Sequence, residues 1–224
     1  MKYMYKCRSD EAVRVTQYEI AGYKDAKLTT YVIEPRECKG ELPCMVYYHG
    51  GGFLLRASGA HYKIAKWYAE RVKCKVVYVD YRLAPNDPFP IPVEDCYCAY
   101  QWTVENAGRL GIDKNRIVIA GDSAGGNLAA SVTLMLNDRK KQLPSGVMLI
   151  YPVTDRRMET KSMKQYTDTP VWNAKLSKMM WDAYLVDDRV ADIKYASPAE
   201  ADTLSCFPDT YMGYSFHRGK NVMR

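Results

Sequence analysis

The part of the chain that most constrains its fold is residues 121–126, Gly-Asp-Ser-Ala-Gly-Gly. An apolar run, residues 116–120, precedes this segment, and residues 127–136 after it have the composition of a helix. A Gly-x-Ser-x-Gly sequence between a strand and a helix is typical of a nucleophile elbow, a sharp turn that exposes its serine at the carboxyl edge of a sheet. We therefore predict a strand, a tight turn and a helix here, with Ser123 as a candidate nucleophile.

A second glycine-rich segment lies upstream. Residues 49–53, His-Gly-Gly-Gly-Phe, follow residues 45–48, which are typical of a buried strand. Consecutive glycines let a substrate come close to the backbone. Acyl transfer develops negative charge on a carbonyl oxygen, and each backbone N–H aimed at that oxygen stabilises the transition state by about 3–4 kcal/mol. The two segments in this order indicate acyl-transfer chemistry at a serine.

Most of the remaining chain alternates between strand-like and helix-like patterns. Residues 13–20 and 27–33 alternate in hydrophobicity around 21–24, which predicts two antiparallel strands. Apolar runs predict buried strands at 45–48, 75–81, 117–120 and 147–151, and a last strand at 210–216. Helical spacing predicts helices at 61–72, 92–107 and 127–136, the first with Ile64, Ala65, Tyr68 and Val72 on one apolar face. This alternation predicts a mostly parallel α/β sheet with helices on both faces.

Residues 155–192 interrupt the alternation. They begin as a loop and continue as a helical pattern that places Leu176, Met179, Met180 and Tyr184 on one face. No repeat, linker or low-complexity segment divides the sequence. We therefore expect a single domain over residues 1–224.

Composition argues against several classes of protein. The net charge is only +6, and the basic cluster at 139–141 lies at a predicted helix C-terminus, where cations are favoured; we expect no nucleic-acid partner. No apolar run reaches the length of a signal-peptide core or a membrane span, so we expect no membrane partner. Three histidines and seven cysteines without a C-x-x-C pair make a metal site unexpected. Reduced thiols suit a cytoplasmic location.

Together the motifs resemble those of the hormone-sensitive-lipase-like family of α/β hydrolases. Besides the two glycine segments, the resemblance rests on Tyr-Arg-Leu-Ala-Pro at 81–85, Phe-Pro at 89–90, Val-Glu-Asp at 93–95, Tyr-Pro-Val-Thr-Asp at 151–155, and residues 195–198 and 204–211. It implies an α/β-hydrolase fold in which residues 155–192 contribute to a small helical cap. It also implies a carboxylic ester hydrolase that acts on small short-acyl esters without a metal or organic cofactor. Ser123 is then the nucleophile, and the N–H groups of Gly51, Gly52 and Ala124 form the oxyanion hole.

A serine nucleophile also needs a histidine base, which a carboxylate holds in the correct tautomer. In this fold the chain order is serine, acid, histidine. The family's acid follows the last strand seen here, and aligning residues 210–212 with that segment places Arg218 where the acid belongs. The family's histidine comes after a further strand. We therefore expect a C-terminally truncated or frameshifted member that lacks the final strand and helix and is weak or inactive.

Three alternatives stay open. A rearranged triad would use His217, the only histidine after Ser123, as base and Asp155 as acid. A catalytically silent small-ligand binder, similar to the gibberellin receptors of this superfamily, would keep the glycine segments without a working base. A non-functional fragment would only fold, or fold as an oligomer. A sheet without its last strand and covering helix exposes an edge and apolar surface that recruit other chains, so we expect a homo-oligomer rather than a clean monomer.

Five other polar residues have simpler expectations. We expect His49 to hold the glycine loop by a local hydrogen bond and His61 to lie in the first turn of a helix. Asp95 is expected to bond to backbone, and Arg82 to pair with a carboxylate inside the fold. Asp122 either braces the turn at Ser123 or is a solvated turn residue, and the sequence does not separate the two.

Overall fold

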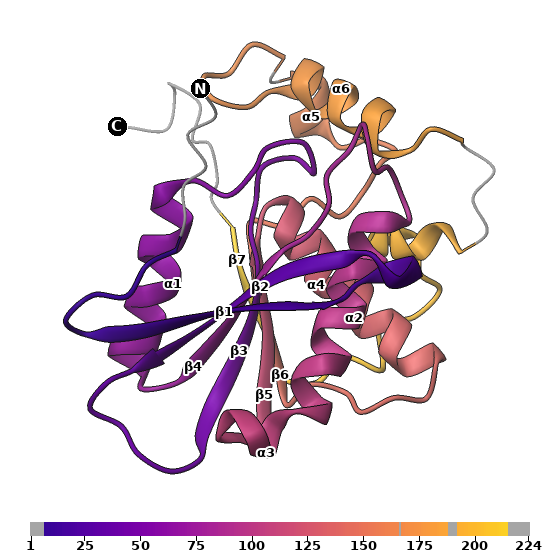
Figure 1. Cartoon of the computed structure of the whole chain (residues 1–224). Coiled ribbons are helices and arrows are strands. Elements are labelled where there is room, and N and C mark those ends of the chain that lie inside the picture. Colours follow the sequence, from indigo (N-terminus) through magenta and orange to yellow (C-terminus); the bar gives the residue numbers. More distant parts are fainter. Residues whose placement is uncertain (1–6, 166, 188–191, 215–224) are drawn as a thin grey trace, which may run out of the picture.

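The computed structural model describes residues 7–165, 167–187 and 192–214, and its centre is a seven-stranded sheet (Figure 1). The strands are β1 (Val13–Ala21), β2 (Lys27–Pro35), β3 (Leu42–Tyr48), β4 (Lys75–Asp80), β5 (Ile112–Asp122), β6 (Gly146–Ile150) and β7 (Thr210–Gly213). Their order is β1-β2-β4-β3-β5-β6-β7. The pairs β1–β2 and β2–β4 are antiparallel, and the other four pairs are parallel. The predicted mostly parallel sheet is therefore confirmed.

The helices lie on both faces of the sheet, as the alternation predicts. They are α1 (Gly59–Val72), α2 (Ile91–Glu105), α3 (Ala107–Leu110), α4 (Ala124–Asp138), α5 (Lys161–Gln165) and α6 (Ala174–Tyr184), and three short 3₁₀ turns are at Tyr23–Asp25, Ile193–Tyr195 and Pro198–Glu200. Figure 1 shows α1 on one face, α2 and α4 on the other, and α5 and α6 beyond one end of the strands. Helix α1 packs on β1, β2 and β4, whereas α4 packs on β3, β5 and β6.

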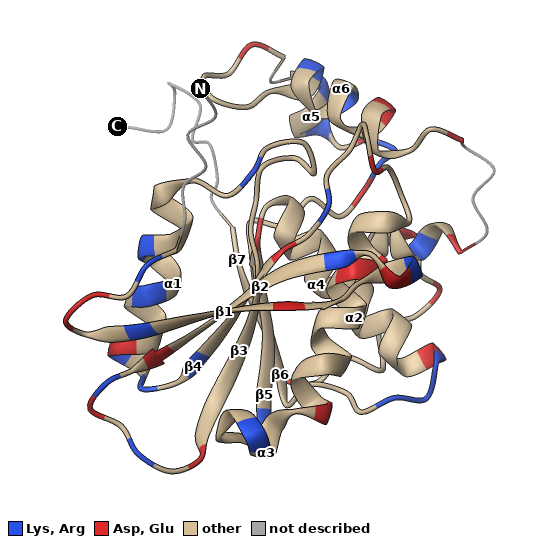
Figure 2. Ribbon diagram, viewed as in Figure 1, with Lys and Arg blue, Asp and Glu red and all other residues tan. Residues whose placement is uncertain are grey.

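The central strands are apolar throughout because both of their faces are covered. In β4, Val77 and Val79 belong to the core under α2 and α4, while Val76 and Tyr78 belong to the core under α1. A strand that alternates between two buried faces needs an apolar side chain at nearly every position. Charged side chains lie mainly on loops and outer helix surfaces, with both signs interspersed (Figure 2). In the basic cluster at 139–141, which follows α4, Arg139 donates two hydrogen bonds to Glu94, of 2.9 and 2.6 Å.

The structure corrects the predicted buried face of α1. The buried residues are Tyr62, Ala65 and Ala69, whereas Ile64 and Val72 are 43% and 56% exposed. Two alanines let the helix lie close to the sheet, and this turns the larger aliphatic side chains outward. Tyr68 is only half-buried. Hydrophobic spacing identified the helix but not the side that faces the sheet.

The predicted face of α6 is also only partly correct. Met180 and Tyr184 are buried, together with Ser177 and Trp181, but Met179 is 64% exposed and Leu176 lies at the surface. The buried residues follow the spacing of one helical face. The predicted helix at 92–107 ends earlier, at Glu105, because the backbone leaves the helix at Asn106 and restarts as α3. Strand β7 ends at Gly213, and residues 215–216 lie outside the described part of the chain.

Candidate active site

The turn between β5 and α4 has the geometry that the Gly-x-Ser-x-Gly segment predicts. Ser123 has φ of 53° and ψ of −117°, and α4 begins at the next residue. A non-glycine residue at positive φ is strained and persists only where its surroundings hold it. Ser123 is half-buried, while Asp122 and Ala124 on either side of it are buried. The chain thus turns sharply and leaves the serine as the accessible residue.

Two glycines make this turn possible because it has no room for side chains. A Cβ atom on Gly121 would collide with the carbonyl of Gly125, and one on Gly125 would collide with the carbonyl of Tyr48. The first helical turn therefore lies directly against β5 and the end of β3. Gly126 approaches Pro152 in the same way, with 2.9 Å from its virtual Cβ to that ring. The three glycines of this segment serve close packing of backbone.

Hydrogen bonds from neighbouring segments hold the strained serine. Its N–H donates to the carbonyl of Ile150 at 2.9 Å, and its carbonyl accepts from the N–H groups of Asn127 at 3.1 Å and Val153 at 3.2 Å. The side-chain amide of Asn127 in turn donates to the carbonyls of Val153 and Ala196, at 2.7 and 2.8 Å. The end of β6 and the loop that follows it therefore fix the backbone at Ser123.

The predicted glycine loop follows β3. Gly51 and Gly52 have φ values of +126° and +61°, which other residues rarely adopt. The carbonyl of Gly51 accepts from the N–H groups of Leu54 and Leu55, at 3.1 and 2.9 Å, and this curls the loop back on itself. The N–H groups of Gly51 and Gly52 donate to none of the described residues. The N–H of Ala124 lies in the first turn of α4, where amide groups lack an intrahelical acceptor.

Asp122 joins the glycine loop to the elbow. Its Oδ1 accepts a 3.0 Å hydrogen bond from the N–H of Gly50 and a 2.7 Å hydrogen bond from the hydroxyl of Tyr47. The aspartate is only 9% exposed. Of the two roles left open by the sequence, Asp122 therefore has the bracing one. Sequence reasoning treated Tyr47 only as a buried strand residue, since nothing in an apolar run marks which tyrosine has a hydroxyl partner.

His49 has the expected local role. Its Nδ1 lies 2.6 Å from the carbonyl of Gly50, and its ring stacks on Tyr81 with 4.5 Å between ring centroids. The hydroxyl of Tyr81 donates to the carbonyl of His49 at 2.6 Å. Burial disfavours the charged imidazolium and lowers the pKa of His49 to about 4. A neutral, buried His49 therefore supports the loop.

Of the two predicted triad partners, Asp155 is paired with Arg157 and His217 lies outside the described residues. Asp155 accepts two hydrogen bonds from the guanidinium of Arg157, of 2.8 and 2.9 Å. These bonds hold the pKa of Asp155 below its usual value. His217 falls outside the described residues, so the pairing of His217 with Asp155 stays a prediction. His61 lies in the first turn of α1, as expected. Within the described chain, Ser123 Oγ has no hydrogen-bond partner.

The predicted pairing of Arg82 with a buried carboxylate is confirmed. The pair holds the segment after β4, which contacts the glycine loop. Arg82 donates two hydrogen bonds of 2.8 Å to the buried carboxylate of Asp95, which also accepts from the N–H of Tyr23 at 2.9 Å. This pair fixes the segment after β4. In that segment the N–H of Ala84 donates to the carbonyl of Phe53 at 3.0 Å.

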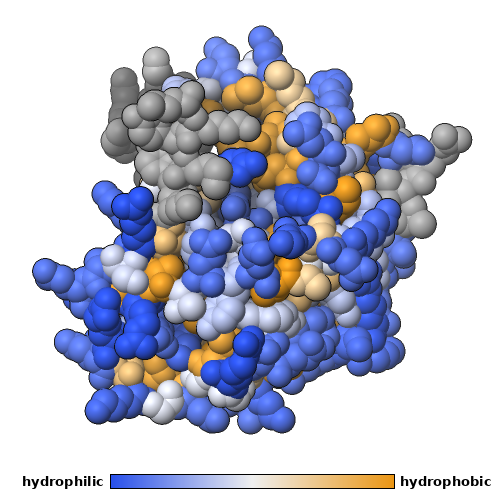
Figure 3. All heavy atoms as spheres, in the orientation of Figure 1, coloured by the Kyte–Doolittle hydropathy of each residue, from blue (hydrophilic) through white to orange (hydrophobic). Residues whose placement is uncertain are grey.

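Helix α6 packs against the glycine loop. The ring of Phe53 stacks on Tyr184 with centroids 3.8 Å apart. A Cβ atom on Gly52 would lie 2.7 Å from the ring of Trp172 and 3.4 Å from Met180. Residues from the interrupted region 155–192 thus cover part of the loop. Figure 3 shows apolar residues gathered on the side of the molecule where α5 and α6 lie.

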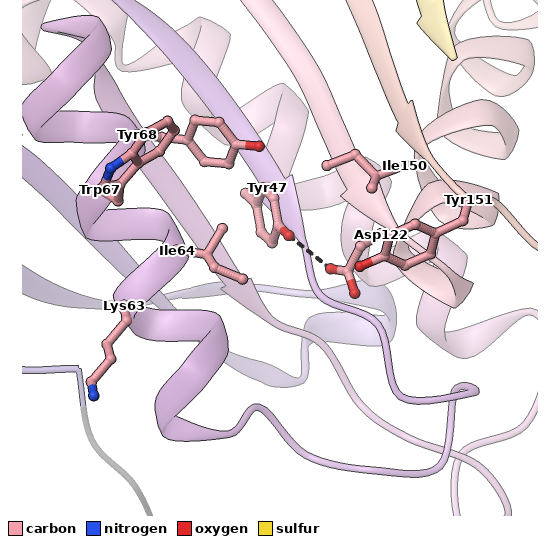
Figure 4. Close-up of a pocket in the computed structure, with 8 residues that line it drawn as sticks. All are labelled: Tyr47, Lys63, Ile64, Trp67, Tyr68, Asp122, Ile150 and Tyr151. Carbon is pink, nitrogen blue, oxygen red and sulfur yellow. Dashed lines mark hydrogen bonds between the residues drawn. The ribbon is translucent and has the colours of Figure 1, made fainter. Parts of the chain in front are cut away.

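A cleft of about 460 Å³ opens beside the site, on the face of the sheet that carries α1. Its walls are mainly aliphatic and aromatic, with one lysine and one aspartate, and they comprise Tyr47, Lys63, Ile64, Trp67, Tyr68, Asp122, Ile150 and Tyr151. Figure 4 shows Tyr47 directed at Asp122 between α1 and the ends of β5 and β6, with Lys63 extending away from the carboxylate. Ser123 does not line this cleft.

Comparison with known proteins identifies the family. Residues 45–217 match the family described as the alpha/beta hydrolase fold. The chain belongs to the α/β-hydrolase family. Its relatives place it in the hormone-sensitive-lipase-like branch: it is 35% identical over 191 residues to carboxylesterase NlhH of Mycobacterium tuberculosis (strain CDC 1551 / Oshkosh), covering 82% of this chain and 58% of that protein. It is 34% identical over 154 residues to hormone-sensitive lipase of Bos taurus, covering 63% of this chain and 20% of that lipase.

Solved structures of esterases agree with the assignment. The bacterial heroin esterase superimposes with a TM-score of 0.84 at 32% identity, covering 90% of this chain and 66% of that one. The hyperthermophilic esterase from Pyrobaculum calidifontis gives a TM-score of 0.83 at 38% identity, covering 89% of this α/β hydrolase and 65% of the esterase. In the described ranges, no helix is long and apolar enough to cross a bilayer. The same ranges contain no cluster of three His, Cys, Asp or Glu side chains suited to a metal ion.

Proposed function

We propose that this α/β hydrolase cleaves small carboxylic esters with short acyl chains, with Ser123 as nucleophile. The observation that carries the proposal is the strained backbone of Ser123 beside a glycine loop whose Gly51 and Gly52 N–H groups donate to none of the described residues. An exposed serine on a sharp strand-to-helix turn is the form in which this fold presents a nucleophile. The similar carboxylesterases, lipases and esterases support the same class of reaction. The reaction needs no metal or organic cofactor.

In this mechanism Ser123 Oγ attacks the ester carbonyl carbon, and the carbonyl oxygen becomes negatively charged. The N–H groups of Gly51, Gly52 and Ala124 donate to that oxygen. Asp122 holds the loop in place through Gly50, so the donors are set before the substrate arrives. The bond to the alkoxy oxygen then breaks, the proton of the Ser123 hydroxyl passes to that oxygen, and the alcohol departs. Water hydrolyses the remaining acyl-serine to the carboxylic acid and free Ser123. Residues 155–192 form part of a cap, because Trp172 and α6 already cover one side of the loop.

Attack by Ser123 requires a base that accepts its hydroxyl proton. A serine without a base stays protonated near neutral pH and attacks slowly. His217 as base with Asp155 as acid is the arrangement that the sequence allows, and Asp155 is already engaged by Arg157. We therefore propose low turnover for the chain as it is. A second candidate, a silent binder of small ligands, is favoured by one observation: the elbow and loop are formed, yet no described imidazole is hydrogen-bonded to Ser123.

A fluorophosphonate probe separates the two functions. The probe phosphonylates an activated serine, and peptide mass spectrometry identifies the residue. Labelling at Ser123, lost in Ser123→Ala, together with turnover of p-nitrophenyl acetate that the same variant removes, supports the esterase. Absence of labelling in a folded protein supports the binder. Equal turnover by the wild type and Ser123→Ala would overturn the esterase proposal, because the hydrolysis would then come from surface nucleophiles.

A further inference from the structure

His61 links the first turn of α1 to the active-site carboxylate of Asp122. Its Nδ1 lies 3.0 Å from the backbone N–H of Ser58 and 2.9 Å from the Ser58 hydroxyl. Its Nε2 lies 3.9 Å from Oδ2 of Asp122. The side chain is about one-fifth exposed, so the contact with Asp122 is partly shielded from water. One imidazole thus bridges a helix cap and the residue that precedes Ser123.

The contact with Ser58 fixes which ring nitrogen carries hydrogen. A backbone N–H can only donate, so Nδ1 must accept and carries no proton in the neutral ring. The hydrogen of a neutral imidazole is then on Nε2, on the side that faces Asp122. Oδ1 of Asp122 is occupied by Gly50 and Tyr47, and Oδ2 is the oxygen that faces His61. The ring therefore presents a positive edge to Oδ2 of this carboxylate.

Helix capping alone does not require histidine. Glu and Gln are the usual residues at the third position of a capping box, since each supplies an acceptor for the N-cap N–H. Histidine supplies that acceptor and, on the opposite side of the ring, a donor. Only the donor has a use at Asp122.

We propose that His61 is a positioning residue for the oxyanion loop. Anchored by Ser58, it holds the Asp122 carboxylate in the orientation that binds the N–H of Gly50, and so keeps Gly51 and Gly52 in place beside Ser123. The effect of His61 on the order of the loop does not depend on the esterase proposal. Its effect on the rate at which Ser123 reacts rests on that proposed function. Oδ2 of Asp122 occupies the space that a Cβ atom on Gly50 would need, so the carboxylate lies directly against the loop backbone.

Two substitutions of His61 distinguish a role in orienting Asp122 from a role in capping α1, because both keep the acceptor that caps the helix. His61→Gln keeps an acceptor for Ser58 and a neutral N–H donor for Asp122. His61→Glu keeps the acceptor, and as a capping residue it is at least as good, but it places a like charge beside Asp122. A purely structural cap predicts equal behaviour of the two variants. Positioning predicts that only the glutamate variant disturbs the loop.

The first measurement is amide hydrogen exchange of residues 49–55 in the full chain. We expect exchange of the Gly50 N–H, which donates to Asp122, to rise about tenfold in His61→Glu and to stay within about twofold of the wild type in His61→Gln. A tenfold rise is the size expected when one hydrogen bond of modest strength, here Gly50 to Asp122, is lost. Adding Asp122→Asn removes the repulsion, and should bring the glutamate variant back to the level of Asp122→Asn alone. That comparison also decides the matter if His61→Glu by itself folds poorly.

The second measurement is the rate of Ser123 phosphonylation by the fluorophosphonate. It should fall about tenfold in His61→Glu and little in His61→Gln, since displacement of the loop forfeits part of the oxyanion stabilisation. Equal exchange and equal labelling in the two variants would overturn the proposal and leave His61 as a cap only. If the wild type is not labelled at all, the proposed esterase function fails, while the exchange comparison still decides the role of His61.

Discussion

The hydroxyl of Tyr47 in β3 donates a 2.7 Å hydrogen bond to Oδ1 of Asp122 at the end of β5, in the interior of the protein. Burial and this neighbouring carboxylate raise the pKa of Tyr47, so the phenol stays protonated and can only donate to the carboxylate. Two adjacent strands are thereby tied together one residue before Ser123. The strength of this bond can be compared with a matched site in the next strand.

Tyr47→Phe should lower the free energy of unfolding by about 1–2 kcal/mol, because it leaves a buried carboxylate with one hydrogen bond fewer. Tyr78→Phe is the control. The ring of Tyr78 stacks on Tyr47 with centroids 5.8 Å apart, and its buried hydroxyl has no partner in the described residues. Its removal should be neutral or stabilising. Urea unfolding followed by circular dichroism measures both, and a larger loss in Tyr78→Phe would contradict the role given to the bond of Tyr47.

The glycines of the elbow should tolerate no side chain. Gly125→Ala would place a Cβ atom against the carbonyl of Tyr48, which is backbone and cannot yield, so we expect a loss of more than about 3 kcal/mol or no folded protein. Gly108→Ala in α3 is the matched change, since no atom lies within 4 Å of its virtual Cβ. That substitution should stabilise by about 0.5–1 kcal/mol through helix propensity. Thermal unfolding of the two variants checks the difference in sign.

Strain at Ser123 predicts that two inactive variants differ in stability. Alanine at a φ of 53° keeps the strained backbone, whereas glycine adopts it freely. Ser123→Gly should therefore be more stable than Ser123→Ala by about 1 kcal/mol, even though glycine gains more freedom in the unfolded chain. Neither variant should be labelled by a fluorophosphonate. Equal melting temperatures would show that the elbow is not strained in solution.

Buried His49 makes stability depend on pH in a definite direction. Its pKa is lowered by burial from 6.5 to about 4 in the folded protein, so between those values the unfolded chain binds a proton that the folded chain does not. Stability from this residue is complete above about pH 6.5 and is lost as pH falls towards 4, by roughly 3 kcal/mol in total. Guanidinium unfolding at pH 7, 5.5 and 4.5 should show a steeper decline in the wild type than in His49→Asn, which keeps a donor for Gly50. Parallel declines would exclude His49 as the source.

The sequence predicted the strands and the two glycine segments because both are determined locally. A run of β-branched residues between turns predicts a strand wherever it packs, and the elbow glycines are required by backbone collisions within a few residues. The faces of α1 and α6 were predicted less well, because exposure of Ile64 and Met179 depends on what lies opposite them. The bonds of Asp122 to Tyr47 and Gly50, and its contact with His61, join distant segments, and no pattern in one sequence marks them.

The edge of the sheet at β7 predicts self-association. One side of this strand pairs with β6, and no strand among the described residues pairs with the other. Tyr211 and Met212, which point to opposite faces of β7, are 64% and 50% exposed, and Tyr151 at the end of β6 is 56% exposed. Open strand edges recruit other chains, and exposed apolar side chains add to this tendency. We therefore expect light scattering at tens of micromolar to show species larger than a monomer.

Tyr211→Lys should shift the distribution towards monomer, because a charge on an edge strand opposes edge pairing. Val186→Lys, at a 74% exposed site after α6, is the control and should change little. A clean wild-type monomer, or equal effects of the two lysines, would show that the β7 edge does not drive association.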